Sequence, residues 1–282
     1  KENSKAEHLI KDNKYINEII ILKRDQTKKS FHDGLKGFFR LVSSIKKHQF
    51  DKVIIFNSSL RYNLVCKFAG INDIYQYPLF KKKDQNIVGA ANNLLKNKFN
   101  LEIKGDPVID IKDENVQKIK VKFNFNGEVK NILLGIGGSG PTKRIPPKIF
   151  IEFMNLCLKN FKCRFFLATG NKNEEIEIMN EILNYHQNLC TPLNELSISE
   201  TLPVIKNCNI AVCNDSSFSH LSAGLGKPTI VLMSDTPLIY GSYCSKMYPI
   251  MPDGEEDVTH GTEGKEKINP LKIFEKFQSI IN

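Results

Sequence analysis

The chain has 282 residues, of which 41% are hydrophobic and 25% are charged, and its formal net charge is +9. These values are typical of a folded globular protein with a substantial core, and the length favours two domains. They exclude a disordered or fibrous chain, and the longest apolar runs are strand-sized, far short of the ~20 residues of a membrane helix.

The positive charge is unevenly distributed. Residues 1–127 carry 25 Lys and Arg against 14 Asp and Glu, a net of +11, whereas residues 128–282 have a net of −2. This asymmetry favours an anionic partner for the first half: nucleic acid, a membrane surface or an acidic substrate, with a merely solvated Lys-rich surface as the alternative. The seven scattered cysteines lack Cys-x-x-Cys spacing and lie mostly in apolar runs, so we expect a reducing, cytosolic compartment without disulfides or a zinc site.

Apolar periodicity predicts alternating strands and helices in the first half. Strands are predicted at 16–22 and 51–56, and helices at 35–48 and 60–68. The Lys- and Asn-rich segment 112–128 is the predicted linker. We therefore expect one domain at residues 1–127 and a second at 128–282.

The alternation of strands and helices returns in the second half, where turn residues separate the elements more clearly. Strands are predicted at 129–135, 164–168, 210–213 and 229–233, and helices directly after Pro146-Pro147 and at 174–183, 199–206, 218–224 and 270–281. Strands that alternate with helices imply parallel sheets covered on both faces. The sequence therefore predicts a two-domain α/β protein with a cleft between the domains.

A glycine-rich loop at residues 135–140, Gly-Ile-Gly-Gly-Ser-Gly, satisfies the dinucleotide-binding pattern Gly-x-Gly-x-x-Gly. Pro141 and Pro146-Pro147 postpone the helix that this motif requires, and the next strand ends in Thr-Gly-Asn without an acidic ribose ligand. Pro141 also excludes a phosphate-binding P-loop, which has Lys after the last glycine. We expect Thr142, Lys143 and Arg144 to bind a phosphorylated ligand just beyond the loop. The alternative is that these residues form a solvated basic turn.

A second polar segment, Asp-Ser-Ser-Phe-Ser-His at residues 215–220, follows a predicted strand and leads into a helix. Its backbone N–H groups and the positive end of the helix dipole can bind an anion. Asp215 or Ser216 could equally be an ordinary N-cap, and His220 could be a histidine packed against the sheet.

Residues 214–232, Asn-Asp-Ser-Ser-Phe-Ser-His-Leu-Ser-Ala-Gly-Leu-Gly-Lys-Pro-Thr-Ile-Val-Leu, resemble the signature of glycosyltransferase family 9, the ADP-heptose:lipopolysaccharide heptosyltransferases. Residues 138–146 are similar to that family's Gly-x-x-x-x-Lys-x-Trp-Pro segment, and residues 165–175 to its strand-Gly-x-x-x-Glu segment. The resemblance covers nearly the whole chain, although its strong motifs lie within residues 131–233.

The resemblance implies a GT-B fold, in which two Rossmann-like domains with parallel sheets face a cleft and the C-terminal domain holds the nucleotide-sugar donor. It implies an inverting, metal-independent glycosyltransferase that needs no cofactor and uses a nucleoside-diphosphate sugar, with an ADP-sugar favoured and heptose or a related sugar as the transferred group. The implied acceptor is an anionic lipid-linked glycan of the lipopolysaccharide type, met in the cytoplasm at the inner membrane surface. Nucleic acid is not an expected partner.

The family's functional positions map onto the motifs of this chain. Lys143, Asp215 and His220 are the implied catalytic residues. Glu174 or Glu175 is expected to hold the nucleoside. The other implied donor-binding residues are Thr142, Arg144, Ser216 and Ser217, and the departures from the family pattern are Ser217 for Gly, Phe218 for Pro and Ile145 for Trp.

The family's catalytic base is an Asp in a loop after the first strand of the N-terminal domain, and this sequence has no match to it. We expect the N-terminal domain to be incomplete by about 30 residues or more, the size of one β-α-β unit. One alternative is a nucleotide-sugar-binding protein that lacks transferase activity, and another is an NAD-dependent oxidoreductase built on the glycine-rich loop.

Overall fold

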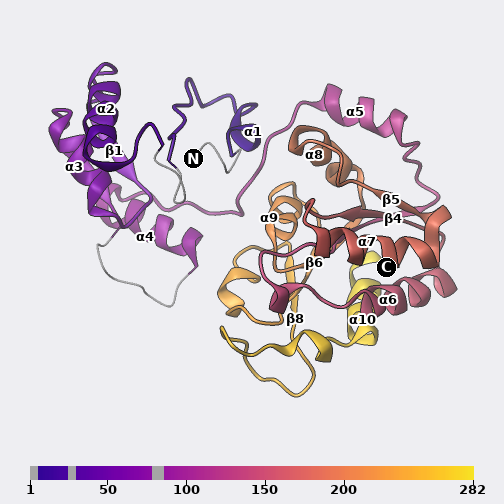
Figure 1. The fold of residues 1–282 in the computed structure, drawn as a ribbon. Coiled ribbons are helices and arrows are strands. Elements are labelled where there is room, and N and C mark those ends of the chain that lie inside the picture. Colours follow the sequence, from indigo (N-terminus) through magenta and orange to yellow (C-terminus); the bar gives the residue numbers. More distant parts are fainter. Residues whose placement is uncertain (1–5, 25–29, 78–85) are drawn as a thin grey trace. The chain divides into compact units, whose positions relative to one another are not determined.

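The computed structural model describes residues 6–24, 30–77 and 86–282. The chain divides into two compact units, unit 1 (Lys1–Gly105) and unit 2 (Asp106–Asn282). Each unit has its own hydrophobic core and its own parallel sheet (Figure 1).

Unit 1 contains a two-stranded parallel sheet and short helices. The predicted helices and strand near residues 35–68 are confirmed, and Leu41 and Val42 of one helix pack against Val65 and Ala69 of the next. The elements of the described part are α1 (Glu7–Ile10), α2 (Gly34–Lys46), β1 (Lys52–Ile55), α3 (Leu60–Phe68), β2 (Asp73–Gln76) and α4 (Ile87–Phe99).

The predicted strand at 16–22 is wrong. These residues have no sheet partner among the described residues, and Ile16, Ile20 and Ile21 are 37%, 38% and 37% exposed. A β-branched run becomes a strand only where a neighbouring strand supplies hydrogen bonds and cross-strand packing, so its composition alone was insufficient.

Unit 2 contains a six-stranded parallel sheet in the order β5-β4-β3-β6-β7-β8, covered by helices on both faces. The predicted strands and helices of this half are confirmed, whereas α5, β5 and β8 were not predicted. The elements are α5 (Asp113–Lys122), β3 (Lys130–Gly135), α6 (Pro147–Asn160), β4 (Cys163–Ala168), α7 (Asn173–His186), β5 (Cys190–Pro192), α8 (Ile198–Asn207), β6 (Ile210–Asn214), α9 (Ser217–Gly224), β7 (Thr229–Leu232), β8 (Met247–Ile250) and α10 (Pro270–Ile281), with 3-10 turns η2 (Pro141–Lys143), η3 (Gln187–Leu189), η4 (Leu238–Tyr240) and η5 (Gly264–Lys267).

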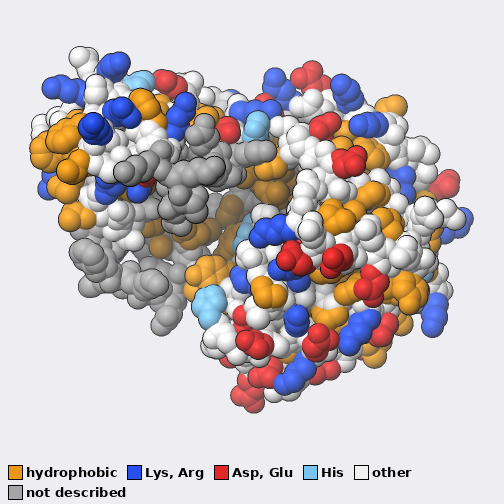
Figure 2. Space-filling view, in the orientation of Figure 1, with side chains coloured by type: hydrophobic (Ala, Val, Ile, Leu, Met, Phe, Trp, Pro, Cys, Tyr) orange, Lys and Arg blue, Asp and Glu red, His pale blue; other side chains and the backbone are white. Residues whose placement is uncertain are grey.

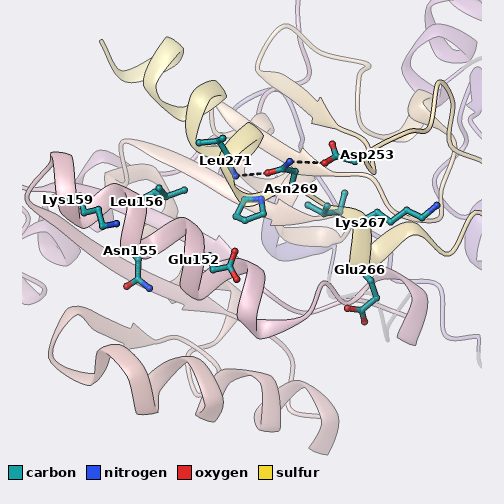
Figure 3. Close-up of a pocket in the computed structure, with 11 residues that line it drawn as sticks. Glu152, Asn155, Leu156, Lys159, Asp253, Glu266, Lys267, Asn269 and Leu271 are labelled. Atoms are coloured by element: carbon teal, nitrogen blue, oxygen red, sulfur yellow. Dashed lines mark hydrogen bonds between the residues drawn. The ribbon is translucent and has the colours of Figure 1, made fainter.

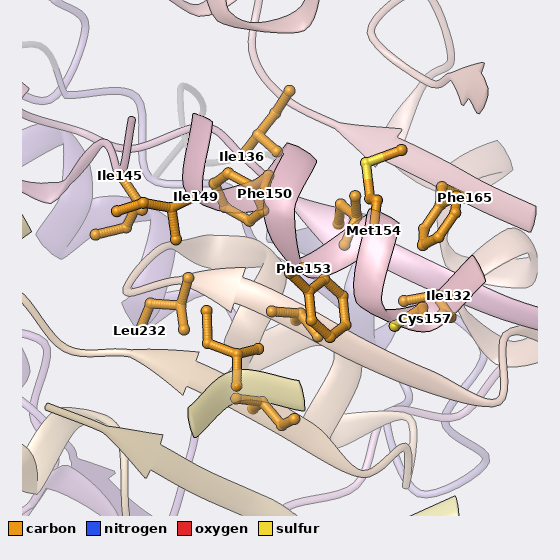
Figure 4. Close-up of a cluster of buried hydrophobic side chains, with 14 of the residues drawn as sticks. Ile132, Ile136, Ile145, Ile149, Phe150, Phe153, Met154, Cys157, Phe165 and Leu232 are labelled. Carbon is orange, nitrogen blue, oxygen red and sulfur yellow. The ribbon is translucent and has the colours of Figure 1, made fainter. Parts of the chain in front are cut away.

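The main core of unit 2 lies between the sheet and helices α6, α7 and α10. The central strands are apolar on both faces, as expected for a parallel sheet covered on two sides. Phe150 and Phe153 of α6 are fully buried with Ile132 and Leu232 of the sheet (Figure 4). Phe153 also meets Phe277 of α10 edge to face, with ring centroids 5.8 Å apart. This rigid layer fixes where the strands of the sheet end.

The segment predicted as a linker, 112–128, belongs to unit 2. It forms α5, which packs on α8, and the ring of Phe125 stacks on Phe166 of β4 with centroids 4.9 Å apart. Arg164 Nη1 donates a hydrogen bond of 2.7 Å to the carbonyl oxygen of Phe123. The units therefore divide after Gly105, ahead of the predicted boundary at 127/128, because Ile119 and Phe125 bury apolar side chains that polar neighbours concealed in the sequence.

The charge asymmetry follows the two units. Residues 1–105 carry 21 Lys and Arg against 10 Asp and Glu, a net of +11, and residues 106–282 have a net of −2. On the face shown in Figure 2, basic and acidic side chains are interspersed over unit 2. The seven cysteines are free thiols. Six of them are buried, as their apolar surroundings in the sequence predicted. Within residues 6–24, 30–77 and 86–282, every helix falls short of the length and apolar character that a bilayer span requires.

Candidate functional site

The sheet of unit 2 reverses its strand order between β3 and β6. From β3 the chain builds outward through β4 to β5, then crosses back to β6 and builds the other way. Ligands of open parallel sheets bind beyond the carboxyl ends of the strands at such a point. Asn214, at the end of β6, donates hydrogen bonds to the carbonyl oxygens of Ile136 (2.8 Å) and Gly137 (3.2 Å), which ties this strand end to the glycine-rich loop.

Lys143 and Asp215 meet at this switch point although they are 72 residues apart in the sequence. Lys143 Nζ lies 2.7 Å from Asp215 Oδ2, and the side chains are 24% and 6% exposed. The end of β6 places the carboxylate, and the 3-10 turn η2 after the glycine-rich loop places the ammonium. This charge-assisted hydrogen bond gives the buried carboxylate a partner and fixes the direction of the lysine side chain.

The two adjacent glutamates of α7 have different surroundings. Glu174 is 65% exposed, and its Oε2 lies 3.5 Å from Arg144 Nη1. Glu175 is buried, and its Oε1 accepts a hydrogen bond of 3.0 Å from the backbone N–H of Gly138. Only Glu174 is therefore open to a ligand, whereas Glu175 holds the glycine-rich loop.

The glycine-rich loop is shaped by that buried carboxylate. A Cβ atom at Gly137 would lie 2.6 Å from Glu175 Oε1, and one at Gly170, after β4, would lie 2.6 Å from Oε2. A side chain at either position would force the Glu175 carboxylate to move away from its present place. In a dinucleotide motif the glycines let the backbone approach a pyrophosphate closely. Here the backbone approaches the carboxylate of Glu175 instead.

The first turn of α9 presents polar groups at the same edge of the sheet. Ser216 is the N-cap residue by position, but its side chain does not cap the helix. Its buried Oγ has no hydrogen-bond partner among the described residues. Ser217 is the first helical residue. The backbone N–H groups of a first helical turn have no partner within the helix, so this end of α9 carries partial positive charge. The ordinary N-cap reading of Ser216 is therefore wrong, and the donor-binding role of this hydroxyl stays a prediction.

His220 lies one turn into α9 and is paired with a residue that the sequence did not indicate. Its Nδ1 is 2.8 Å from the hydroxyl oxygen of Tyr243, and the two rings stack with centroids 5.6 Å apart and planes 22° apart. Burial lowers the pKa of His220, Asp215 opposes that shift and Lys143 adds to it. The imidazole is thus neutral near pH 7 and belongs electrostatically to the same cluster as the Lys143–Asp215 pair.

Thr142 is held by the loop that follows β7. Its carbonyl oxygen accepts a hydrogen bond of 2.8 Å from Ser234 Oγ. The pKa of Asp235 is lowered first by the backbone N–H of Glu263 and further by the Thr142 hydroxyl. Ser234 and Asp235 thus position η2, and no sequence pattern pointed to them.

Two cavities of unit 2 are compared with this region. One of about 550 Å³ is lined by two predicted residues, Arg144 and Glu174, together with Pro141, Pro146, Pro147, Ile178, Lys265 and Glu266. The other, of about 750 Å³, lies between α6 and the start of α10 (Figure 3). There the polar groups satisfy one another, because Asn269 donates to Asp253 Oδ2 at 2.7 Å and accepts from the backbone N–H of Leu271 at 2.9 Å. The first cavity is the one that adjoins the predicted phosphate-binding residues.

The structure therefore brings most of the predicted residues to one edge of one sheet. Lys143, Asp215 and His220 form one electrostatic cluster, and Arg144 and Glu174 line the neighbouring cavity. Their roles toward a ligand stay predictions. Glu175 differs from these residues, because its carboxylate accepts a hydrogen bond from the backbone N–H of Gly138.

Solved structures share this fold. The heptosyltransferase II of E. coli, described as acting with ADP-heptose on lipopolysaccharide, aligns with 86% of this chain and 80% of its own at a TM-score of 0.68 and 18% identity. A glycosyl transferase family 9 structure from Veillonella parvula aligns with 99% of this chain and 86% of its own at a TM-score of 0.77 and 15% identity. E. coli heptosyltransferase WaaC with ADP aligns at 0.62 and 13% identity, over 86% and 76% of the two chains. The predicted α/β fold of the GT-B class is confirmed.

Sequence comparison gives the family. Lipopolysaccharide heptosyltransferase 1 of Campylobacter coli is 24% identical over 155 residues, which is 54% of this chain and 45% of that protein, so the match spans less than half of that relative's length. Residues 38–243 match the sequence profile of glycosyltransferase family 9 (heptosyltransferase). That match covers well over half of the chain, from α2 through α9 to the residue that pairs with His220, and the chain therefore belongs to glycosyltransferase family 9.

Proposed function

We propose that this protein is an inverting, metal-independent glycosyltransferase that moves a heptose or related sugar from a nucleoside-diphosphate sugar, with an ADP-sugar favoured, to a glycan acceptor of the lipopolysaccharide type. The observation that carries the proposal is the pairing of partly buried Lys143 with buried Asp215 at the switch point of the unit 2 sheet, beside the first turn of α9. Family membership supplies the reaction class.

In the proposed reaction an acceptor hydroxyl oxygen forms a bond to the anomeric carbon while the bond from that carbon to the donor diphosphate breaks. The leaving diphosphate gains negative charge, and preorganised donors stabilise such charge most effectively where water is excluded. Lys143, fixed by Asp215, supplies a cation, and Ser216 with the N–H groups of the first turn supplies hydrogen bonds. Arg144 joins Lys143 at the diphosphate, and Glu174 binds the nucleoside end. The acceptor proton passes to a general base, for which the family's Asp has no match in residues 1–282.

The acceptor side of the proposal rests on charge. Unit 1 carries a net of +11, which suits an anionic lipid-linked glycan at the inner membrane surface and a cytoplasmic, peripheral location. Sedimentation with vesicles tests this part: the protein should pellet with vesicles that contain anionic lipid and stay in the supernatant with zwitterionic vesicles at the same salt concentration. Equal partition between the two would remove membrane contact from the proposal.

The donor side is tested with ligands in solution. Thermal shift with ADP-, UDP- and GDP-sugars and with NAD should show stabilisation by a nucleotide sugar, and stabilisation by NAD alone would overturn the proposal. Transfer of labelled sugar from ADP-heptose to heptose-deficient lipopolysaccharide then measures the reaction. Lys143→Ala should abolish donor binding. Lys148→Ala is the matched control and should leave donor binding unchanged, because Lys148 is 64% exposed and paired with Glu266. Binding without transfer would favour a nucleotide-sugar-binding protein.

A further inference from the structure

Tyr243 lies in the loop between β7 and β8, far from every motif of the sequence. Its ring packs beside a second core cluster of unit 2 that includes Met233 and Met247. The loop is anchored on both sides of the tyrosine. Gly241 sits where a Cβ atom would lie 2.4 Å from Met233 Sδ, and the backbone N–H of Ser245 donates a hydrogen bond of 2.9 Å to the carboxylate of Asp106. The position of the Tyr243 hydroxyl is therefore set by the fold.

The contact between Tyr243 and His220 has the geometry of a directed hydrogen bond. The distance from Oη to Nδ1 is 2.8 Å, within the usual range, and the stacked rings restrict rotation of the imidazole. Within the described part of the chain, neither the hydroxyl nor the imidazole has another hydrogen-bond partner. The second ring nitrogen, Nε2, is thus unpaired by protein there.

We propose that Tyr243 is a positioning residue that donates its hydroxyl hydrogen to Nδ1 of His220 and thereby holds the imidazole as the neutral tautomer with hydrogen on Nε2. The unprotonated imidazole nitrogen is a strong acceptor, whereas a phenol oxygen is a weak one because its lone pair is delocalised into the ring. The pair therefore prefers O–H to donate and nitrogen to accept. Nε2 then carries a hydrogen toward a ligand.

The electrostatic surroundings support this protonation state. Burial raises the pKa of Tyr243 to about 12, with a further contribution from Asp215, so its hydroxyl keeps its hydrogen near pH 7. Burial also lowers the pKa of His220, and Lys143 lowers it further against the opposing effect of Asp215. The result is a neutral donor beside a charged pair, and such a donor can bind a ligand oxygen without competing with Lys143 for Asp215.

This inference rests on the proposed function only for the identity of the ligand that Nε2–H meets. The tautomer itself is a property of the free protein. Long-range ¹H–¹⁵N NMR correlation of the uniformly labelled full chain distinguishes the two neutral tautomers and the imidazolium, and His220→Gln identifies the His220 signals among the six histidines.

Near pH 7.5, His220 should show hydrogen on Nε2 and a hydrogen-bonded Nδ1. Tyr243→Phe should move the Nδ1 resonance toward that of a nitrogen without a donor. Tyr240→Phe is the matched control, because Tyr240 lies in the same loop and is 44% exposed. Hydrogen on Nδ1, an imidazolium, or an Nδ1 resonance that Tyr243→Phe leaves in place would overturn the proposal.

Binding of ADP measured by calorimetry supplies the second readout. Tyr243→Phe should weaken binding roughly three- to tenfold, the usual effect of one hydrogen bond, and should have no further effect in a His220→Ala background. Independent, additive effects of the two substitutions would contradict the positioning role. If ADP does not bind to the unsubstituted protein, the proposed donor site fails, and the NMR result still decides the tautomer.

Discussion

The two glutamates at the start of α7 give the sharpest test of the site, because the family resemblance could not choose between them. Glu175→Ala removes the acceptor of the Gly138 N–H, which is a buried donor. An unsatisfied buried donor costs about 1–3 kcal/mol of folding free energy. Glu174→Ala removes a side chain that is 65% exposed and 3.5 Å from Arg144. An exposed ion pair contributes less than about 1 kcal/mol, so stability should hardly change.

Urea denaturation followed by far-ultraviolet circular dichroism measures the difference, since the chain has no Trp for fluorescence. With a urea dependence of about 1–3 kcal/mol per molar, the unfolding midpoint of Glu175→Ala should fall by roughly 1 M, and that of Glu174→Ala should stay where it is. ADP affinity should show the opposite ranking after correction for the folded fraction, because Glu174 lines the open cavity.

The reasoning would be refuted by an unchanged urea midpoint for Glu175→Ala together with a loss of ADP affinity equal to that of Glu174→Ala. Glu175→Gln provides a finer control. Its amide oxygen can still accept from Gly138 N–H, so it should recover most of the stability that Glu175→Ala loses. A Gln variant as unstable as the Ala variant would show that the charge, and not the hydrogen bond, holds the loop.

Three more predictions follow from single contacts. Lys143→Ala leaves Asp215, 6% exposed, without its cation and should cost about 1–3 kcal/mol in urea, and adding Asp215→Asn should restore stability but not ADP binding. Hydrogen bonds from the Ser245 hydroxyl and N–H lower the pKa of Asp106, so this carboxylate stabilises the fold fully above its ordinary pKa of 3.8. The difference in melting temperature between the unsubstituted protein and Asp106→Asn should therefore disappear as the pH falls through the lowered pKa. Gly135→Ala places a Cβ atom 2.6 Å from Cys213 Sγ and should lower the unfolding free energy by about 1–3 kcal/mol, measured by denaturant titration.

The strands of unit 2 were predictable because their residues are apolar on both faces. β3 and β6 read as short apolar runs between polar or turn residues, and they are buried along almost their whole length. β8, with Pro249 in the sequence Met-Tyr-Pro-Ile, has no such pattern and becomes a strand only because β7 offers an edge to pair with. Helix α5 was missed because its buried face consists of little more than Ile119 among charged neighbours.

The site was predictable to the extent that the strand ends determine it. Lys143 and Asp215 follow neighbouring parallel strands, so the topology alone brings them to one edge of the sheet. Tyr243 and Asp235 lie in loops without periodicity, and their partners are 23 and 93 positions away in the sequence. Only the three-dimensional path of those loops could show the contacts.

The glycine-rich loop explains why its sequence pattern misleads. Gly135 is required because Cys213 and Phe218 approach it from β6 and α9, and Gly137 lies against the carboxylate of Glu175. Two of the three motif glycines thus have close neighbours within unit 2, whereas a Cβ atom at Gly140 would meet nothing within 4 Å. A pyrophosphate at the same N–H would also meet the negative charge of Glu175. These contacts agree with the proposal that a ligand is bound beyond the loop, beside Lys143 of η2 and the first turn of α9.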